Sequence, residues 1–133
     1  MIASTTRLNT PGIALGRVDA VHALTDVTGF GLLGHLHKLA RASGVTAEVE
    51  AAAVPYLDGA REALRDGFVS GGTRRNLDWV RPHLDTGPVN EDEALLLADA
   101  QTSGGLLVAG ELPGYPIIGR LLPPEPGVTI RLR

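Results

Sequence analysis

Hydrophobic residues recur at helical spacing in two stretches of the chain, and a third predicted helix begins at a capping pattern. Leu32, Leu36 and Leu39 are four and three residues apart, so they share one face of a helix, and Gly44 provides a natural stop. Leu57, Ala60 and Leu64 keep the same spacing. Asn90, with Glu93 three residues later, is placed to cap a helix over the apolar run 94–98. The pattern predicts helices over 31–43, about 56–66 and 91–98.

Strands are predicted where apolar residues alternate with polar ones or form short continuous runs. Residues 45–50 alternate, which is typical of a strand with one buried face, and residues 105–109 form an apolar run. The predicted strands cover 19–24, 45–50, 105–109, 116–122 and 128–132. Because strands and helices alternate, we expect an α/β (α+β) fold with a sheet covered by helices.

The stretch between the second and third predicted helices, residues 67–90, lacks a clear period. Gly71-Gly72, Pro82 and Gly87-Pro88 interrupt it, and these residues break regular structure. We therefore predict a long, structured loop in which only residues 76–80 form a short element.

Length and composition limit the possible functions. A chain of 133 residues suits one domain over 1–133, with residues 1–15 irregular, and the apolar runs are too short for a membrane span. No signal peptide is apparent after Met1. The chain has no cysteine, which excludes disulfides and a cysteine nucleophile within it. Its basic residues are dispersed, so we expect no nucleic-acid partner.

The first segment with potential chemistry is the turn at 25–31, between a predicted strand and a predicted helix. Thr25, Thr28, Gly29 and Gly31 suit phosphate, because a helix start presents free backbone amides and glycine lets the backbone come close. Asp26 adds a carboxylate, the ligand that Mg²⁺ takes together with phosphates. The alternative is structural: one of these side chains caps the helix and the glycines only permit the turn.

The second segment, 99–105, runs from a predicted helix into a predicted strand. Gln101, Thr102, Ser103 and Gly104 offer an amide, hydroxyls and close backbone access, which suit a phosphate or nucleotide. The alternative is an ordinary helix-to-strand connection with glycine at the helix end.

Two further groups of residues are weaker candidates. The arginine pair Arg74-Arg75 could hold a phosphate, although exposed arginines are usually only solvated. His35 and His37 lie two apart on a helix, so they point to different faces and cannot readily bind one metal ion. We interpret the two histidines as surface or interface residues.

Four strings in order along the chain resemble selenide, water dikinases (selenophosphate synthetases): TDVTGFGLLGHL at 25–36, SGGTRRNL at 70–77, DAQTSGGLLV at 99–108 and IIGR at 117–120. The resemblance covers the C-terminal half of that family. It implies a helix-covered mixed sheet like that of the C-terminal domain of aminoimidazole ribonucleotide synthetase. It also implies an ATP-dependent, magnesium-using reaction that converts selenide to selenophosphate, in a cytoplasmic homodimer. Asp26 matches the metal-binding aspartate of the family's C-terminal domain.

Three departures from the family pattern limit this resemblance. The nucleophilic cysteine or selenocysteine and its lysine belong to the family's N-terminal ATP-binding domain, which is absent here, so we expect no activity from the chain alone. Ala100 stands where the family usually has proline. Only residues 110–115 replace a helix of about a dozen residues; a link this short suits an antiparallel turn, so we expect altered pairing of the last strands or an oligomer.

Two other functions stay open from the sequence. The chain could be a non-catalytic binding or assembly module with the same fold, which the shortened link favours slightly. It could also be a domain of a related enzyme, such as a purine-pathway synthetase or a thiamine-monophosphate kinase. The pairing of TDVTGFG with QTSGG resembles the selenium enzyme more than either.

Overall fold

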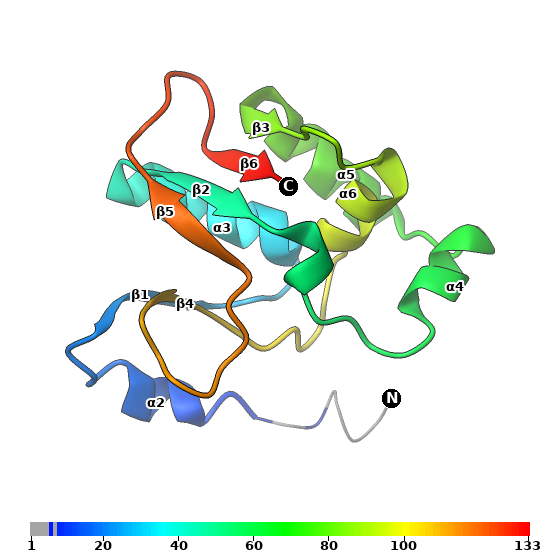
Figure 1. The fold of residues 1–133 in the computed structure, drawn as a ribbon. Coiled ribbons are helices and arrows are strands. Elements are labelled where there is room, and N and C mark those ends of the chain that lie inside the picture. Colours follow the sequence, from blue (N-terminus) through cyan, green and yellow to red (C-terminus); the bar gives the residue numbers. More distant parts are fainter. Residues whose placement is uncertain (1–5, 7) are drawn as a thin grey trace.

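The computed structural model describes residue 6 and residues 8–133, and within these residues six strands form two separate sheets (Figure 1). The strands are β1 (Val21–Asp26), β2 (Thr46–Val49), β3 (Leu84–Asp85), β4 (Leu106–Gly110), β5 (Gly119–Leu122) and β6 (Ile130–Leu132). β1 and β4 form an antiparallel pair. The other four are ordered β3-β6-β2-β5, with β6 parallel to both neighbours and β5 antiparallel to β2. The sheet is therefore mixed, as predicted.

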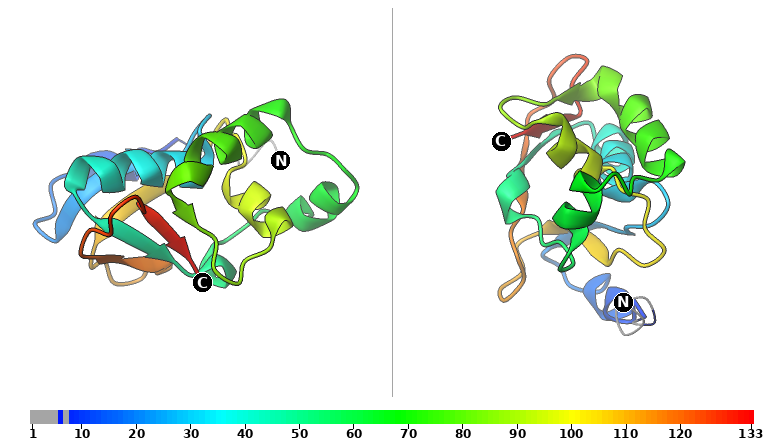
Figure 2. Two further views of the ribbon diagram at one scale, coloured as in Figure 1. Left: turned by 90° about the horizontal axis from the view of Figure 1, so that it is seen from above. Right: turned by 90° about the vertical axis from the view of Figure 1, so that its right-hand side faces the viewer.

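The described residues contain five α-helices and two short 3₁₀ helices. They are α2 (Pro11–Leu15), α3 (Gly31–Ser43), α4 (Ala60–Arg65), α5 (Gly71–Val80) and α6 (Glu91–Leu97), with short 3₁₀ helices η1 (Ala51–Ala53) and η2 (Arg81–His83). α3 contacts β1, β2 and β6, and α5 and α6 pack on α3. Both views in Figure 2 show α3 along one face of the four-stranded sheet. Within the described residues, no helix is long and apolar enough to cross a membrane.

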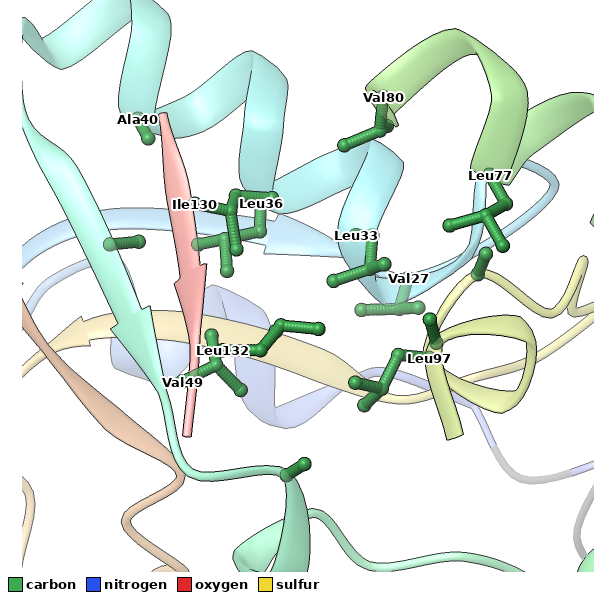
Figure 3. Close-up of a cluster of buried hydrophobic side chains, with 14 of the residues drawn as sticks. Val27, Leu33, Leu36, Ala40, Val49, Leu77, Val80, Leu97, Ile130 and Leu132 are labelled. Carbon is green, nitrogen blue, oxygen red and sulfur yellow. The ribbon is translucent and has the colours of Figure 1, made fainter. Parts of the chain in front are cut away.

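The core lies between α3 and the four-stranded sheet and continues toward α5 and α6 (Figure 3). Leu33 of α3 is fully buried, and Leu36 lies beside Ile130 of β6. Leu132 lies beside Val49, so alternate residues of β6 and β2 face the helix, as the strand period requires. Burial of each such side chain contributes about 1.5–3 kcal/mol.

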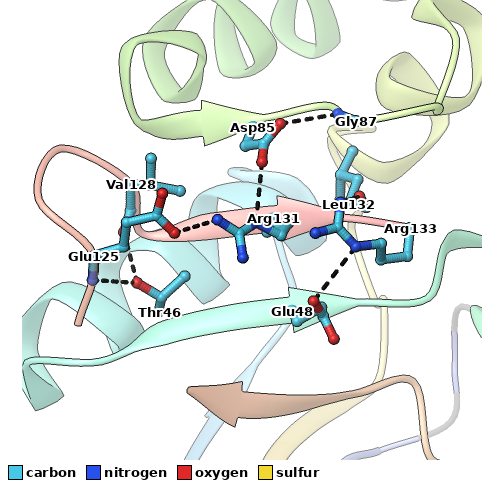
Figure 4. Close-up of polar contacts among 9 residues, drawn as sticks. All are labelled: Thr46, Glu48, Asp85, Gly87, Glu125, Val128, Arg131, Leu132 and Arg133. Atoms are coloured by element: carbon cyan, nitrogen blue, oxygen red, sulfur yellow. Dashed lines mark hydrogen bonds and ion pairs between the residues drawn. The ribbon is translucent and has the colours of Figure 1, made fainter. Parts of the chain in front are cut away.

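The opposite face of this sheet carries charged pairs (Figure 4). Arg131 donates to Asp85 over 3.0 Å and also pairs with Glu125, while Arg133 lies 3.4 Å from Glu48. Exposed pairs of this kind typically stabilise by at most about 1 kcal/mol each. They keep this face of the sheet polar.

Most elements confirm the sequence prediction, but the chain between 67 and 90 does not. It contains the ten-residue helix α5, where we predicted a loop with a short element only at residues 76–80. Ser70 caps this helix by accepting a hydrogen bond from the Thr73 amide over 3.1 Å. Gly71 and Gly72 occupy its first turn, where the amides have no partner within the helix in any case. The prediction was wrong because it treated the two glycines as helix breakers and overlooked the cap that Ser70 provides.

Smaller corrections concern the chain ends and one link. Residues 11–15, expected to be irregular, form α2, which Pro11 opens; residues 1–5 and 7 lie outside the described part. α4 is shorter than predicted because Gly59, with φ of 83°, cannot be helical. The link after β4 forms no hairpin: it carries the chain from the β1-β4 sheet to β5 in the other sheet.

Candidate functional site

The two polar segments singled out in the sequence lie side by side. β1 and β4 bring Asp26 opposite Leu106, and the pairing continues beyond the strands. The Val27 amide donates to the Gly105 carbonyl over 2.9 Å, and the Gly104 amide donates back to Val27 over 2.9 Å. The structure therefore joins 25–31 to 99–105, which the sequence alone did not establish.

Glycines make this contact between the segments possible. Gly31 has φ of 66°, and a Cβ atom there would lie 2.4 Å from the Ala98 carbonyl oxygen. A Cβ on Gly104 would lie 2.7 Å from the Val27 carbonyl oxygen. In contrast, nothing lies within 4 Å of a Cβ built on Gly29. Gly29 is thus open to a ligand, as is Gly105 of the second segment, whose Cβ position is also empty.

The start of α3 is not capped by a side chain. Its cap residue is Phe30, without a side-chain hydrogen bond, so neither Thr25, Asp26 nor Thr28 serves as the helix cap. The Thr25 hydroxyl donates to the Asp26 carbonyl over 3.1 Å. Among the described residues, none pairs with or donates to the Asp26 carboxylate, which is exposed. This carboxylate is free to bind a cation.

In the second segment, Gln101 has its backbone and side chain in use. Its amide donates to the Thr28 carbonyl over 3.1 Å, and its side-chain amide donates to Asp99 over 2.5 Å. Thr102 is exposed and Ser103 is half-buried, and in the described residues neither hydroxyl has a hydrogen-bond partner. These two hydroxyls are the free polar groups of the segment.

His35 of α3 forms a hydrogen bond with the first segment. The Thr28 amide donates to His35 Nε2 over 3.0 Å, so Nε2 is an acceptor and the ring proton lies on Nδ1. Burial lowers the pKa of His35, with Lys38 acting in the same direction and Asp26 opposing it. The neutral ring that the hydrogen bond needs is therefore the favoured form.

His37 faces the core, so the interpretation of the two histidines as surface or interface residues was wrong for His37, whereas His35 is half-buried. The His37 side chain is 1% exposed. Its Nδ1 lies 2.7 Å from the Thr129 hydroxyl, and its ring stacks on that of His83 with centroids 4.9 Å apart. The two histidines do point to different faces, as predicted, but each face meets a partner that the helical pattern alone does not reveal.

The chain around the arginine pair, residues 70–76, also reaches the site, through residues that sequence reasoning missed. The Asn76 side-chain nitrogen donates to the Gly29 carbonyl over 2.9 Å and to the Ala98 carbonyl over 3.1 Å. The buried Thr73 hydroxyl donates to Asp99 over 2.5 Å. Arg74 and Arg75, the weaker candidates for holding a phosphate, are exposed on α5.

The residues present fit only part of a magnesium site. No group of three or more His, Asp or Glu side chains that could hold a metal ion occurs in the described part of the chain. Mg²⁺ is often held by one or two carboxylates together with waters and substrate phosphates. Asp26 can supply one such carboxylate, and further ligands would have to come from a phosphate or from another segment.

Comparison with known proteins gives a consistent match. The family model described as "AIR synthase related protein, C-terminal domain" matches residues 5–109. A selenide, water dikinase of Pseudomonas putida is 52% identical over 102 residues, which cover 77% of this chain and 29% of that protein. Proteins of the same name from Bordetella bronchiseptica (51% over 107 residues; 80% and 30%) and Pseudomonas aeruginosa (55% over 102 residues; 77% and 29%) are also similar. The chain thus spans about three tenths of these relatives, in their C-terminal part.

Proposed function

We propose that this chain contributes magnesium and phosphate contacts to a selenide, water dikinase. The chain belongs to the family of AIR synthase related proteins, C-terminal domain. The observation that carries the proposal is the unpaired Asp26 carboxylate beside the open Gly29, in a turn joined to residues 99–105. The similarity to selenide, water dikinases over about four fifths of the chain supports it.

In the proposed reaction, ATP, selenide and water give selenophosphate, AMP and phosphate. Bound Mg²⁺ would neutralise charge on the phosphates. Asp26 binds the cation, the backbone at Gly29 approaches a phosphate, and the free hydroxyls of Thr102 and Ser103 donate to phosphate oxygens. Thr25, Thr28, Gly31, Gln101 and Gly104 complete the two segments.

The chain has no cysteine, so a cysteine or selenocysteine nucleophile must lie outside these 133 residues. We propose that residues 1–133 form one C-terminal domain. Its partners are an N-terminal ATP-binding domain and a second copy of the protein, in the cytoplasm. On this proposal the domain holds and orients phosphates, and it performs no chemistry alone.

The test is a titration of the chain with Mg²⁺ and ADP, followed by heteronuclear NMR. We expect amide shifts in 25–31 and 99–105, and an apparent Mg²⁺ affinity at least about tenfold weaker in Asp26→Asn, because a carboxylate ligand is lost. Asp66→Asn is the matched control, since Asp66 is exposed at the end of α4. If neither segment of the wild type responds, the proposal fails and a non-catalytic assembly module becomes the better interpretation.

A further inference from the structure

Asn76 lies beneath the open turn without reaching its surface. Its side chain is 8% exposed, and its single amide nitrogen donates to both Gly29 and Ala98. These two carbonyls belong to different segments, one before α3 and one after α6. Both donor hydrogens of the carboxamide are therefore used to tie the segments to α5.

The hydrogen bond from Asn76 to Gly29 is the one that reaches this residue, because the backbone hydrogen bonds that the described residues make between the two segments do not include Gly29. They involve Val27 and Thr28 on the first segment. In the part of the chain that the structure describes, Gly29 makes one hydrogen bond, and Asn76 donates it. The peptide between Gly29 and Phe30 lies within a turn that the Gly31 amide closes by donating to the Thr28 carbonyl over 2.9 Å. Asn76 adds the hydrogen bond that holds the carbonyl of this peptide.

That orientation determines where an amide points. The peptide between Gly29 and Phe30 is trans and planar, so its carbonyl and its N–H point in opposite directions. With the carbonyl directed inward at Asn76, the Phe30 N–H is directed away from α5. Among the described residues this N–H has no hydrogen-bond partner.

The backbone at Phe30 and Gly31 also has the geometry of an anion-binding turn. Phe30 is right-handed (φ of −90°, ψ of −1°) and Gly31 follows in the left-handed region with φ of 66°. Successive residues of these two kinds turn their N–H groups toward one concave side, a backbone shape that suits anions. The Gly31 amide already donates to the Thr28 carbonyl over 2.9 Å, so within the described residues the Phe30 amide is the N–H that this turn leaves free.

We propose that Asn76 is a positioning residue of the phosphate site: by holding the Gly29 carbonyl inward, it turns the Phe30 N–H outward to the phosphate. The inference rests on the proposed function. Asn76 itself touches no ligand, and it acts through the orientation of one peptide. The Thr73 bond to Asp99 holds the neighbouring segment in the same way but leaves Gly29 untouched.

Asn76→Leu tests this role, because leucine is close to asparagine in shape, lacks both donors and adds no charge that would itself repel phosphate. Ser70→Ala is the matched control: it removes the cap of α5 but leaves the donor to Gly29 in place. If the leucine variant does not fold, Asn76→Ala is measured instead. All variants are compared at a temperature where denaturation curves show them folded.

The measurements use NMR with inorganic phosphate and, separately, Mg²⁺ with ADP as probes. In the ligand-free wild type the Gly29 carbonyl carbon should show the shift of a hydrogen-bonded group, which Asn76→Leu loses. We expect phosphate to move the Phe30 amide of the wild type, and the variant to bind about tenfold more weakly, the value of one hydrogen bond to a charged group. Ser70→Ala should bind like the wild type.

Different outcomes overturn different statements. Equal affinity of the wild type and Asn76→Leu refutes the positioning role and leaves the proposed function standing. An equal loss in Ser70→Ala also refutes it, because the effect would then follow from a weaker α5. If the wild type binds neither probe, the proposed function and the inference fall together.

Discussion

Gly31→Ala is the substitution for which the structure predicts the largest effect at the site. Gly31 has φ of 66°, and the new methyl group would lie 2.4 Å from the carbonyl oxygen of Ala98 and 2.8 Å from that of Asp99. Both neighbours are backbone atoms, so they cannot move aside as the end of a flexible side chain can. The two segments of the candidate site would have to separate.

The cost has two parts, and a second glycine separates them. A left-handed backbone costs an alanine about 1–2 kcal/mol, and forcing an extra methyl into a filled space costs about 1–3 kcal/mol. Gly44, at the end of α3, has φ of 64° but nothing within 4 Å of its Cβ position. Gly44→Ala should therefore cost only the first part, and Gly31→Ala about 2–5 kcal/mol.

Urea denaturation followed by far-UV circular dichroism measures both free energies of unfolding. We expect Gly31→Ala to be less stable than Gly44→Ala by about 1–3 kcal/mol, a large share of the 5–15 kcal/mol typical of a whole domain. If the two variants lose the same free energy within about 0.5 kcal/mol, the close approach of Gly31 to Ala98 is not a real constraint.

Two further predictions concern the core. Leu33→Ala should lower the free energy of unfolding by about 2–5 kcal/mol, because Leu33 is fully buried; an unchanged urea midpoint would contradict this. Burial, then His83 and Arg41, lower the pKa of His37 below 6.5, so the unfolded chain binds its proton more readily than the folded one. The contribution of His37 to the free energy of unfolding should therefore be fully present above about pH 6.5 and be lost as the pH drops through the lowered pKa. This loss should be smaller in His37→Asn. Denaturation curves with the same pH dependence for both proteins would contradict the reasoning.

The sequence predicted the elements whose signals are local. α3 follows from the spacing of Leu33, Leu36 and their neighbours, and Gly44 ends it in the left-handed conformation that a helix stop requires. α6 follows in the same way, because Asn90 accepts from the Glu93 amide over 2.9 Å. Each of these features is set by residues within one or two turns of each other.

The helix α5 was missed although its signal is also local. Thr73, Leu77 and Val80 recur at helical spacing and are all buried, but Gly71 and Gly72 in front of them argued for a loop. Glycine lowers helix stability most in the interior, and these two stand in the first turn after a capping serine. The cap outweighs the glycines because it supplies a partner for an amide that would otherwise have none.

The site itself depends on contacts that no local pattern encodes. Asn76 is 47 residues from Gly29 and 22 from Ala98, and as a polar residue on a helix it carries no mark of its partners. The resemblance to a family pointed to both loops as segments, but it did not separate ligand contact from support within them. The packing around each residue distinguishes the residues that could contact a ligand from those that support the loops.

The glycines of the site show why this distinction matters for function. At Gly31 and Gly104, backbone atoms of another segment occupy the space that a Cβ atom would need. At Gly29 that space is empty. A substitution at Gly31 or Gly104 should therefore lower stability and binding together, while one at Gly29 should act mainly on binding. On the proposed function, backbone amides face the phosphate at this turn, so its affinity should depend on buried side chains, such as Asn76, that do not touch the ligand.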